Sequence, residues 1–200
     1  MAVRDLVIHV SETPRLAYSG RELRPHFIRT HFKVAGDAAV SFRGPCDVRG
    51  GALVDLEDRE LGLFIHSADM VHFLVEIFGS DLTSMVLLQR LLATIVADRV
   101  RSALDPAIAA EVRREGDDVY VRSGKLSVSI ATVSAVSSLI HFGVNVDTEG
   151  TPVPTAGLGP LGIDPAVFAR GVLEDLRDEV RGVGSALVKV RPVHDEADDA

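Results

Sequence analysis

Residues 123–150, SGKLSVSIATVSAVSSLIHFGVNVDTEG, constrain the fold of this chain more than any other segment. Apolar residues alternate with small or polar residues on both sides of a Ser-rich stretch, which is typical of two antiparallel strands joined by a turn. With the turn placed at residues 133–135, Ser127 lies opposite His141. The two strands then share one apolar face and one face of small and polar side chains.

The polar face of this predicted hairpin is a candidate ligand site. It carries mainly small residues, which leave space for a ligand, and its lysine supplies a point charge for a carbonyl or a phosphate. The alternative interpretation is a face open to water, which antiparallel sheets commonly have. The site interpretation makes Lys125 and His141 candidate catalytic residues, and Ser127, Ser129, Gly143 and Asn145 candidate ligand-binding residues.

The rest of the chain indicates an α+β fold with a mixed, mainly antiparallel sheet, because strands and helices cluster rather than alternate. Helical periodicity with capping residues predicts helices, and short apolar runs bounded by turn residues predict strands. The predicted strands are 6–10, 37–42, 52–58 and 117–121, the predicted helices are 67–79, 81–104 and 165–186, and the predicted loops are 43–51 and 151–164.

Composition and charge restrict the class of partner. A net charge of −8 and an aromatic content of 5% argue against nucleic-acid binding. No apolar run is long enough to span a membrane, no signal peptide is recognisable, and a lone cysteine fits a reducing compartment, so we expect a cytoplasmic protein. We expect one domain over residues 1–190 and an acidic disordered tail over 191–200.

Two further groups of residues have a functional and a structural interpretation. On the predicted helix 67–79, Asp69, His72 and Glu76 would share one face and could hold a divalent metal, or they could form a solvated helix face. Cys46, in the predicted loop 43–51, could be a nucleophile activated by neighbouring arginines, or an inert small residue.

Three sequence blocks carry a resemblance over most of the chain. With FRGPCDV, DMVHFLVE and KLSVSIATVSAVSSLIHFGVN, the chain resembles an uncharacterised family of small prokaryotic proteins, a domain family of unknown function. That resemblance implies no activity.

Two shorter blocks resemble the superfamily of lipoate–protein ligases, biotin–protein ligases and lipoyl(octanoyl) transferases. They are Arg49-Gly50-Gly51, and Lys125 followed by SSLIHFGVNVD. This resemblance implies a sheet with helices packed on one side, a lysine that contacts an acyl carbonyl or acyl-phosphate, and an Arg-Gly-Gly loop that packs on the ligand. The chain departs from the transferase pattern because residues 151–159 contain no cysteine to carry a thioester.

Together these observations predict a protein that binds a small acyl, acyl-adenylate or related metabolite, with acyl transfer or ligation as the reaction. The alternatives are a non-catalytic ligand-binding or assembly protein on the same fold, and a metal-dependent hydrolase. The sequence indicates no particular cofactor. An apolar sheet edge would support a homodimer.

Overall fold

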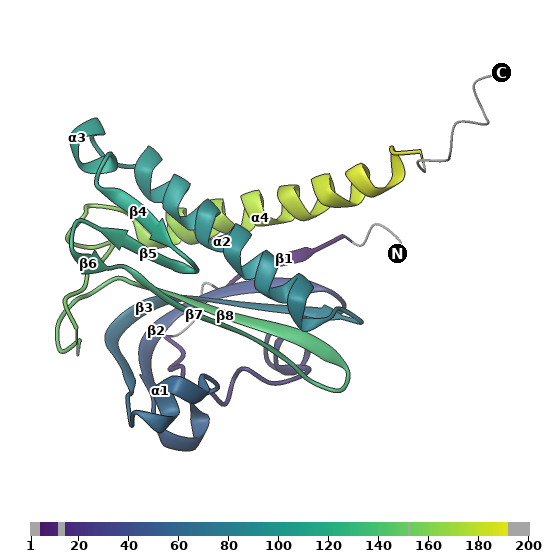
Figure 1. The fold of residues 1–200 in the computed structure, drawn as a ribbon, viewed down its shortest axis with the longest axis horizontal. Coiled ribbons are helices and arrows are strands. Elements are labelled where there is room, and N and C mark those ends of the chain that lie inside the picture. Colours follow the sequence, from purple (N-terminus) through teal and green to yellow (C-terminus); the bar gives the residue numbers. More distant parts are fainter. Residues whose placement is uncertain (1–4, 12–14, 152, 192–200) are drawn as a thin grey trace.

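The computed structural model describes residues 5–11, 15–151 and 153–191, which form two sheets and two long helices (Figure 1). The larger sheet has the strand order β1-β2-β3-β8-β7, and the smaller one has the order β4-β5-β6. Only the β1–β2 pairing is parallel among the named strands. The predicted mixed, mainly antiparallel sheet is therefore confirmed. The strands are β1 (Val7–Val10), β2 (Ala38–Val48), β3 (Ile65–Phe78), β4 (Val112–Glu115), β5 (Asp118–Val121), β6 (Gly124–Lys125), β7 (Ser127–Val133) and β8 (Ser137–Asn145).

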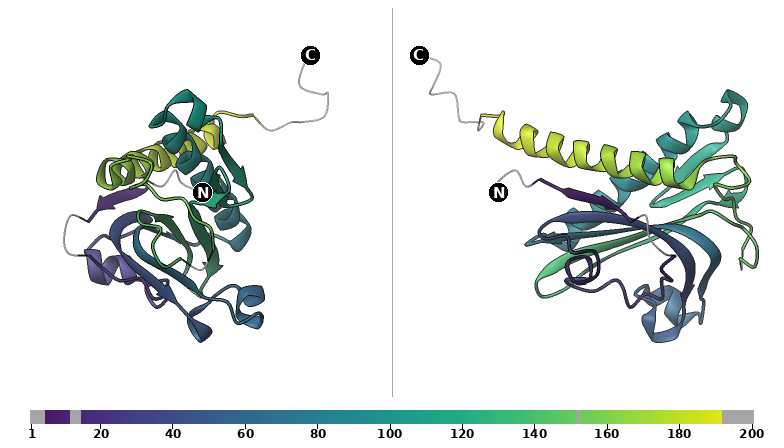
Figure 2. Two further views of the ribbon diagram at one scale, coloured as in Figure 1. Left: turned by 90° about the vertical axis from the view of Figure 1, so that its left-hand side faces the viewer. Right: turned by 180° about the vertical axis from the view of Figure 1, so that it is seen from behind.

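The two long helices, α2 (Leu82–Ser102) and α4 (Pro165–Val188), lie on the same side of the larger sheet (Figure 2). Each begins at an aspartate whose carboxylate accepts hydrogen bonds from main-chain N–H groups of the first turn, which is a strong helix start. Both helices were predicted within a few residues of their ends. Their apolar faces and one face of the sheet form the main core, which includes Phe73, Leu92, Phe142, Val172 and Leu176.

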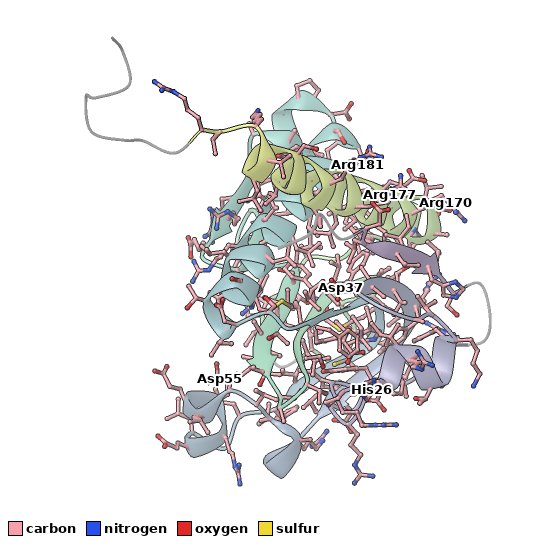
Figure 3. The ribbon with its side chains drawn as sticks, turned by 90° about the vertical axis from the view of Figure 1, so that its right-hand side faces the viewer. His26, Asp37, Asp55, Arg170, Arg177 and Arg181 are labelled. Atoms are coloured by element: carbon pink, nitrogen blue, oxygen red, sulfur yellow. The ribbon has the colours of Figure 1, made fainter. Side chains whose placement is uncertain are left out.

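The other face of the larger sheet is covered by residues 15–34 and by a short helical segment. Residues 15–34 contain a π-helix, η1 (Ile28–Phe32), and they contribute Tyr18 and Phe27 to a second core that also holds Met70 and Leu74. Next to it lie η2 (Gly50–Ala52) and α1 (Leu56–Glu60). A four-residue helix, α3 (Pro106–Ala109), follows α2. Figure 3 places Asp55, at the start of α1, on the far side of the sheet from the arginines of α4.

The prediction of a helix over residues 67–79 is wrong, because this segment forms the central strand β3. Its alternate residues enter different cores: Phe73 packs toward the helices, whereas Met70 and Leu74 pack toward residues 15–34. A strand buried on both faces has no polar face, so its apolar run resembles that of a buried helix.

The loop predicted over 43–51 and the strand predicted over 52–58 are also wrong. β2 continues through Gly44 and Pro45 to Val48, with a bulge between Gly44 and Cys46. At Gly44 the chain of residue 16 passes so close that a Cβ atom would lie 2.1 Å from its carbonyl oxygen, so glycine serves a close approach here. Asp55 accepts hydrogen bonds from two main-chain N–H groups and starts α1 where a strand was expected.

The hairpin of β7 and β8 is present, but its register differs from the predicted one. Four residues, 134–137, lie between the last paired residues, Val133 and Ser138, and the Ser134 N–H donates to the Ser137 carbonyl oxygen. Ser127 therefore pairs with Val144, and Ile130 pairs with His141. Each β7 residue is thus paired with a β8 residue three positions later than predicted. Because this shift is an odd number, Val128 and Ile130 share a face with His141, and Ser127 and Ser129 point to the other face.

Two sequence expectations concern the rest of the chain. None of the helices in the described ranges is both long and apolar enough to cross a membrane. The loop predicted over 151–164 contains no helix or named strand in its described residues, and the predicted acidic tail lies, except for Arg191, outside the described residues.

Candidate functional site

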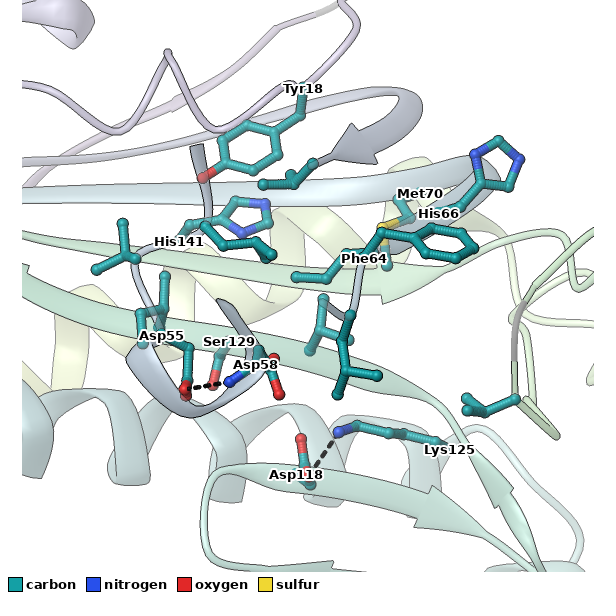
Figure 4. A pocket seen from close by; sticks show the side chains of 18 of the residues that line it. Tyr18, Asp55, Asp58, Phe64, His66, Met70, Asp118, Lys125, Ser129 and His141 are labelled. Atoms are coloured by element: carbon teal, nitrogen blue, oxygen red, sulfur yellow. Dashed lines mark hydrogen bonds and ion pairs between the residues drawn. The ribbon is translucent and has the colours of Figure 1, made fainter. Parts of the chain in front are cut away.

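A cavity of about 550 Å3 lies on the face of the larger sheet that is turned away from α2 and α4 (Figure 4). The segment around η2 and α1 forms one wall, and the other side is bordered by Asp117, Asp118, Thr151, Val153 and Thr155. The floor consists of strand residues that are mainly apolar. They are Met70 of β3, Val128 and Ile130 of β7, and His141 and Asn145 of β8.

Lys125 lies at one end of this cavity in a fixed main-chain position. Its N–H donates to the carbonyl oxygen of Pro154, and its own carbonyl oxygen accepts from the Asn145 side-chain amide at 3.3 Å. The Lys125 Nζ lies 2.7 Å from Oδ2 of Asp118, and its side chain is 30% exposed. An ammonium group has three donors, so the pair with Asp118 leaves donors for a ligand oxygen.

Three more carboxylates line the cavity, and two of them are hydrogen-bonded within the protein. Asp55 accepts from the main chain of α1, and Asp117 accepts from the Ser129 hydroxyl at 2.7 Å and from the Gln89 side chain at 2.9 Å. Burial and the neighbouring Asp55 raise the pKa of Asp58, whereas Lys125 lowers it. The lysine end of the cavity is therefore rich in negative charge.

The far part of the floor holds a stack of aromatic side chains. The Tyr18 and His141 rings are nearly parallel, with centroids 3.6 Å apart, and both residues are only 3% exposed. Nε2 of His141 lies 3.0 Å from Nδ1 of His72, whose Nε2 lies 3.1 Å from the carbonyl oxygen of Gly44. Burial lowers the pKa of His72 to about 4 and holds the pKa of His141 well below its usual value. Both rings are therefore neutral near pH 7.

These contacts determine which ring nitrogens carry protons. The Gly44 carbonyl can only accept, so Nε2 of His72 carries the hydrogen and Nδ1 of that neutral ring must accept. Nε2 of His141 is then the donor to His72, and Nδ1 of His141 carries the lone pair. His141 can therefore offer a hydrogen-bond acceptor to the cavity, but burial makes it a weak base.

The structure brings together part of the predicted site. Lys125, His141 and Asn145 all line the cavity. Ser129 borders it, although its hydroxyl is bound to Asp117 and Gln89. Ser127 lies elsewhere: it is fully buried, and its hydroxyl oxygen accepts from the main-chain N–H of Val119 at 2.9 Å.

The predicted glycine and Arg-Gly-Gly contacts lie outside the cavity lining. A Cβ at Gly143 would be 3.1 Å from the Met70 side chain, so this glycine makes room for Met70. Nothing lies within 4 Å of a Cβ placed at Gly50 or Gly51. The Arg49 guanidinium pairs with Asp47 and lies 4.7 Å from the ring centroid of Phe64, which does line the cavity. Arg49 therefore supports the wall rather than the floor.

The residues of the metal hypothesis are separated by the strand that replaces their helix. His72 and Glu76 point to one face of β3, whereas Asp69 points to the other face and pairs with Arg43. Glu76 accepts hydrogen bonds from the His26 N–H and the Ser137 hydroxyl. In the described ranges, no three His, Cys, Asp or Glu side chains are grouped to hold a metal ion.

Cys46 does not have the properties of a nucleophile. It is completely buried, and burial raises its pKa to about 12. The inert interpretation of this cysteine therefore fits the structure.

Several cavity residues were missed by the sequence analysis, above all Tyr18, Asp58, Met70 and Asp118. Tyr18 reaches the site because its segment pairs with β2 through an isolated bridge to Cys46, a long-range contact with no local sequence signal. Asp118 opens the predicted strand 117–121 and could have been found only by knowing that β6 returns beside it, which places Lys125 opposite Tyr120.

Structures of known ligases share this fold. The chain is similar to the biotin protein ligase from Aquifex aeolicus in complex with biotin and ATP, with a TM-score of 0.52 and 17% identity over 91% of this chain and 73% of that one. It is also similar to protein Ta0514 from T. acidophilum with bound lipoic acid, with a TM-score of 0.53 and 13% identity over 88% and 86% of the two chains. At this identity the likeness shows the fold alone, which confirms the ligase-like architecture.

Two relatives are much more similar in sequence. A protein of unknown function from Pyrococcus horikoshi has a TM-score of 0.87 and 38% identity, covering 94% of this chain and all of that one. The uncharacterized protein MJ0805 from Methanocaldococcus jannaschii is 37% identical over 155 residues, which are 74% of this chain and 68% of the relative. A family model described as a domain of unknown function, DUF366, matches residues 7–191, and the chain belongs to that family.

Proposed function

We propose that this protein binds a small acyl metabolite in the cavity, with the carbonyl end of the ligand at Lys125. The observation that carries this proposal is the position of Lys125. Its ammonium group lies at one end of a cavity of about 550 Å3 whose floor is mainly apolar. An enclosed apolar surface with a few polar groups is typical of small-molecule sites. Structures of the same fold hold lipoic acid or biotin, which supports a ligand of this size.

The polar groups of the cavity define how such a ligand would lie. Its hydrocarbon part would cover Met70, Val128 and Ile130, where burial of apolar surface contributes about 25 cal/mol per Å2. Its carbonyl oxygen would accept from Lys125, whose position is fixed by Asp118. The carboxylates around Lys125 disfavour a free phosphate, because like charges at short range repel each other. An acyl group or a single carboxylate, which carries at most one negative charge, therefore fits better than an unaccompanied adenylate.

Acyl transfer or ligation is the reaction class that we propose to test first. Lys125 would polarise the carbonyl in such a reaction. A second candidate function is non-catalytic binding of the same ligand. It is favoured by Cys46, which is buried and whose pKa is raised, so that this cysteine does not provide a thioester nucleophile.

Native mass spectrometry of protein purified without added ligand tests the proposal. We compare the wild type with Lys125→Met and with Lys189→Met, a matched change at an exposed lysine beyond the end of α4. We expect a retained small molecule, or a thermal shift with medium-chain fatty acids, in the wild type and in Lys189→Met but not in Lys125→Met. Equal binding by all three proteins, or binding by none, would contradict the role of Lys125. Transfer of a retained acyl group to hydroxylamine would separate an activated acyl species from a passive ligand.

A further inference from the structure

The floor of the cavity carries two polar atoms that the protein itself does not use. They are the hydroxyl of Tyr18 and Nδ1 of His141, on two rings that stack against each other (Figure 4). Neither atom has a hydrogen-bond partner among the described residues, and neither belongs to the fully enclosed polar atoms that lack one. Since both residues line the cavity, these two atoms are open to it and free to bind a ligand.

The chemistry of the pair is complementary. Nδ1 of His141 is an acceptor, because the chain of hydrogen bonds through His72 to Gly44 fixes its tautomer. Tyr18 offers a donor, because burial raises the pKa of its hydroxyl and keeps it protonated. A donor and an acceptor held on two parallel rings match the C=O and N–H groups of an amide.

We propose that Tyr18 and His141 bind an amide or similar donor–acceptor group in the tail of the ligand, at the end of the cavity away from Lys125. This inference rests on the proposed function, since it needs a ligand whose other end lies at Lys125. His141 and Asn145 are four residues apart on β8, which separates them by about 13 Å in a strand. The Asn145 amide contacts the main chain of Lys125. A medium-chain acid with a terminal amide would connect the two ends.

The alternative is that the two rings only fill space. A phenylalanine at position 18 would then pack equally well, because the Tyr18 hydroxyl makes no hydrogen bond with the described residues. The neighbours argue against mere filling, because His72 has both ring nitrogens engaged while the atoms left unengaged are those of the two rings that line the cavity.

Two probe acids of similar chain length test the inference: octanoic acid and suberic acid monoamide. By isothermal titration calorimetry we expect the wild type to bind the monoamide about tenfold or more tightly than octanoic acid, the factor that one good buried hydrogen bond supplies. Tyr18→Phe keeps the ring and removes only the hydroxyl. It should lower the preference for the monoamide to within about threefold and leave the affinity for octanoic acid unchanged.

Tyr120→Phe is the matched control, because these are the two tyrosines of the chain and Tyr120 lies in β5 beside Lys125. It should change the binding of both acids by the same factor. If the wild type binds both acids equally and Lys125→Met binds neither, the amide inference is overturned while the proposed function stands. If the wild type binds neither acid, both fail. A preference that Tyr18→Phe leaves intact would also overturn the role of this pair.

Discussion

The buried pair of His72 and His141 should make the protein lose stability in a specific range of acid pH. Both imidazoles are neutral in the folded state because burial lowers their pKa values, to about 4 for His72 and well below the usual value for His141. In the unfolded chain a histidine has a pKa of about 6.5. The unfolded state therefore binds protons that the folded state does not, and the free energy of unfolding falls as the pH decreases from about 6.5 toward 4.

The magnitude follows from the difference between the two pKa values of one histidine. For His72, the difference between 6.5 and about 4 corresponds to about 3 kcal/mol, all of which is present above pH 6.5 and lost below pH 4. His141 adds to the loss in the same direction. For a domain whose total stability is about 5–15 kcal/mol, this is enough to unfold a substantial fraction of the molecules.

The variant His141→Phe isolates this contribution. It keeps a ring against Tyr18 and removes one titrating group, but it leaves Nδ1 of His72 without a donor. We expect it to be less stable than the wild type by about 1–3 kcal/mol near pH 8, and we expect the difference to shrink toward about pH 5. The control is His31→Gln at an exposed histidine. Its free energy of unfolding should differ from that of the wild type by the same amount at every pH.

The assay is guanidinium chloride unfolding followed by far-UV circular dichroism at a series of pH values. If the difference between His141→Phe and the wild type stayed constant from about pH 8 to about pH 5, the acid sensitivity would belong to the carboxylates, and the reasoning about the buried pair would be refuted.

Three further predictions concern single side chains. Asp58→Asn should tighten the binding of a fatty acid about threefold or more in calorimetry, because it removes a like charge from the lysine end of the cavity, whereas Glu60→Gln on the exposed side of α1 should not. Cys46 should resist iodoacetamide in the folded protein at neutral pH and react after unfolding, as judged by mass spectrometry, because it is buried and its pKa is raised to about 12. Gly44→Ala should destabilise the protein by about 3 kcal/mol or more in chemical unfolding, because the new Cβ would lie 2.1 Å from a carbonyl oxygen, whereas Gly51→Ala, with nothing within 4 Å, should change stability little.

Local signals in the sequence were sufficient for the elements whose two sides differ. The helices α2 and α4 have one apolar face and an aspartate cap, so their periodicity and their starting residues both predicted them. The strand at 37–42 and the hairpin of β7 and β8 were found as short runs bounded by turn residues, although residues 38–42 and β8 are buried on both faces. The helix predicted over 67–79 failed because β3 is covered on both faces, and this removes the alternation that marks a strand.

The register of the hairpin decides which of the predicted site residues line the cavity. Lys125, His141 and Asn145 line it, but the faces of β7 were exchanged relative to β8, because four residues instead of three lie between the last paired residues of the two strands. The sequence alone does not favour either turn length. The exchange places Val128 and Ile130 on the floor where serines were expected, so the floor is more apolar than the one the sequence indicated.

The acid sensitivity and the amide preference both require that His141 is neutral in the folded protein, so one measurement can test both. Suppose that Nδ1 of His141 accepts a hydrogen bond from the ligand. The ratio of the affinities for suberic acid monoamide and octanoic acid should then be constant between about pH 8 and about pH 6. The reason is that burial holds the pKa of His141 well below 6.5, so the ring stays neutral in this range. Both acids carry the same carboxyl group, so titration at the lysine end cancels in the ratio. A histidine open to solvent would instead lose its acceptor near pH 6.5, and the ratio would fall with a midpoint there. Such a midpoint would show that water reaches the ring, and it would remove the basis for both the neutral pair and the amide site.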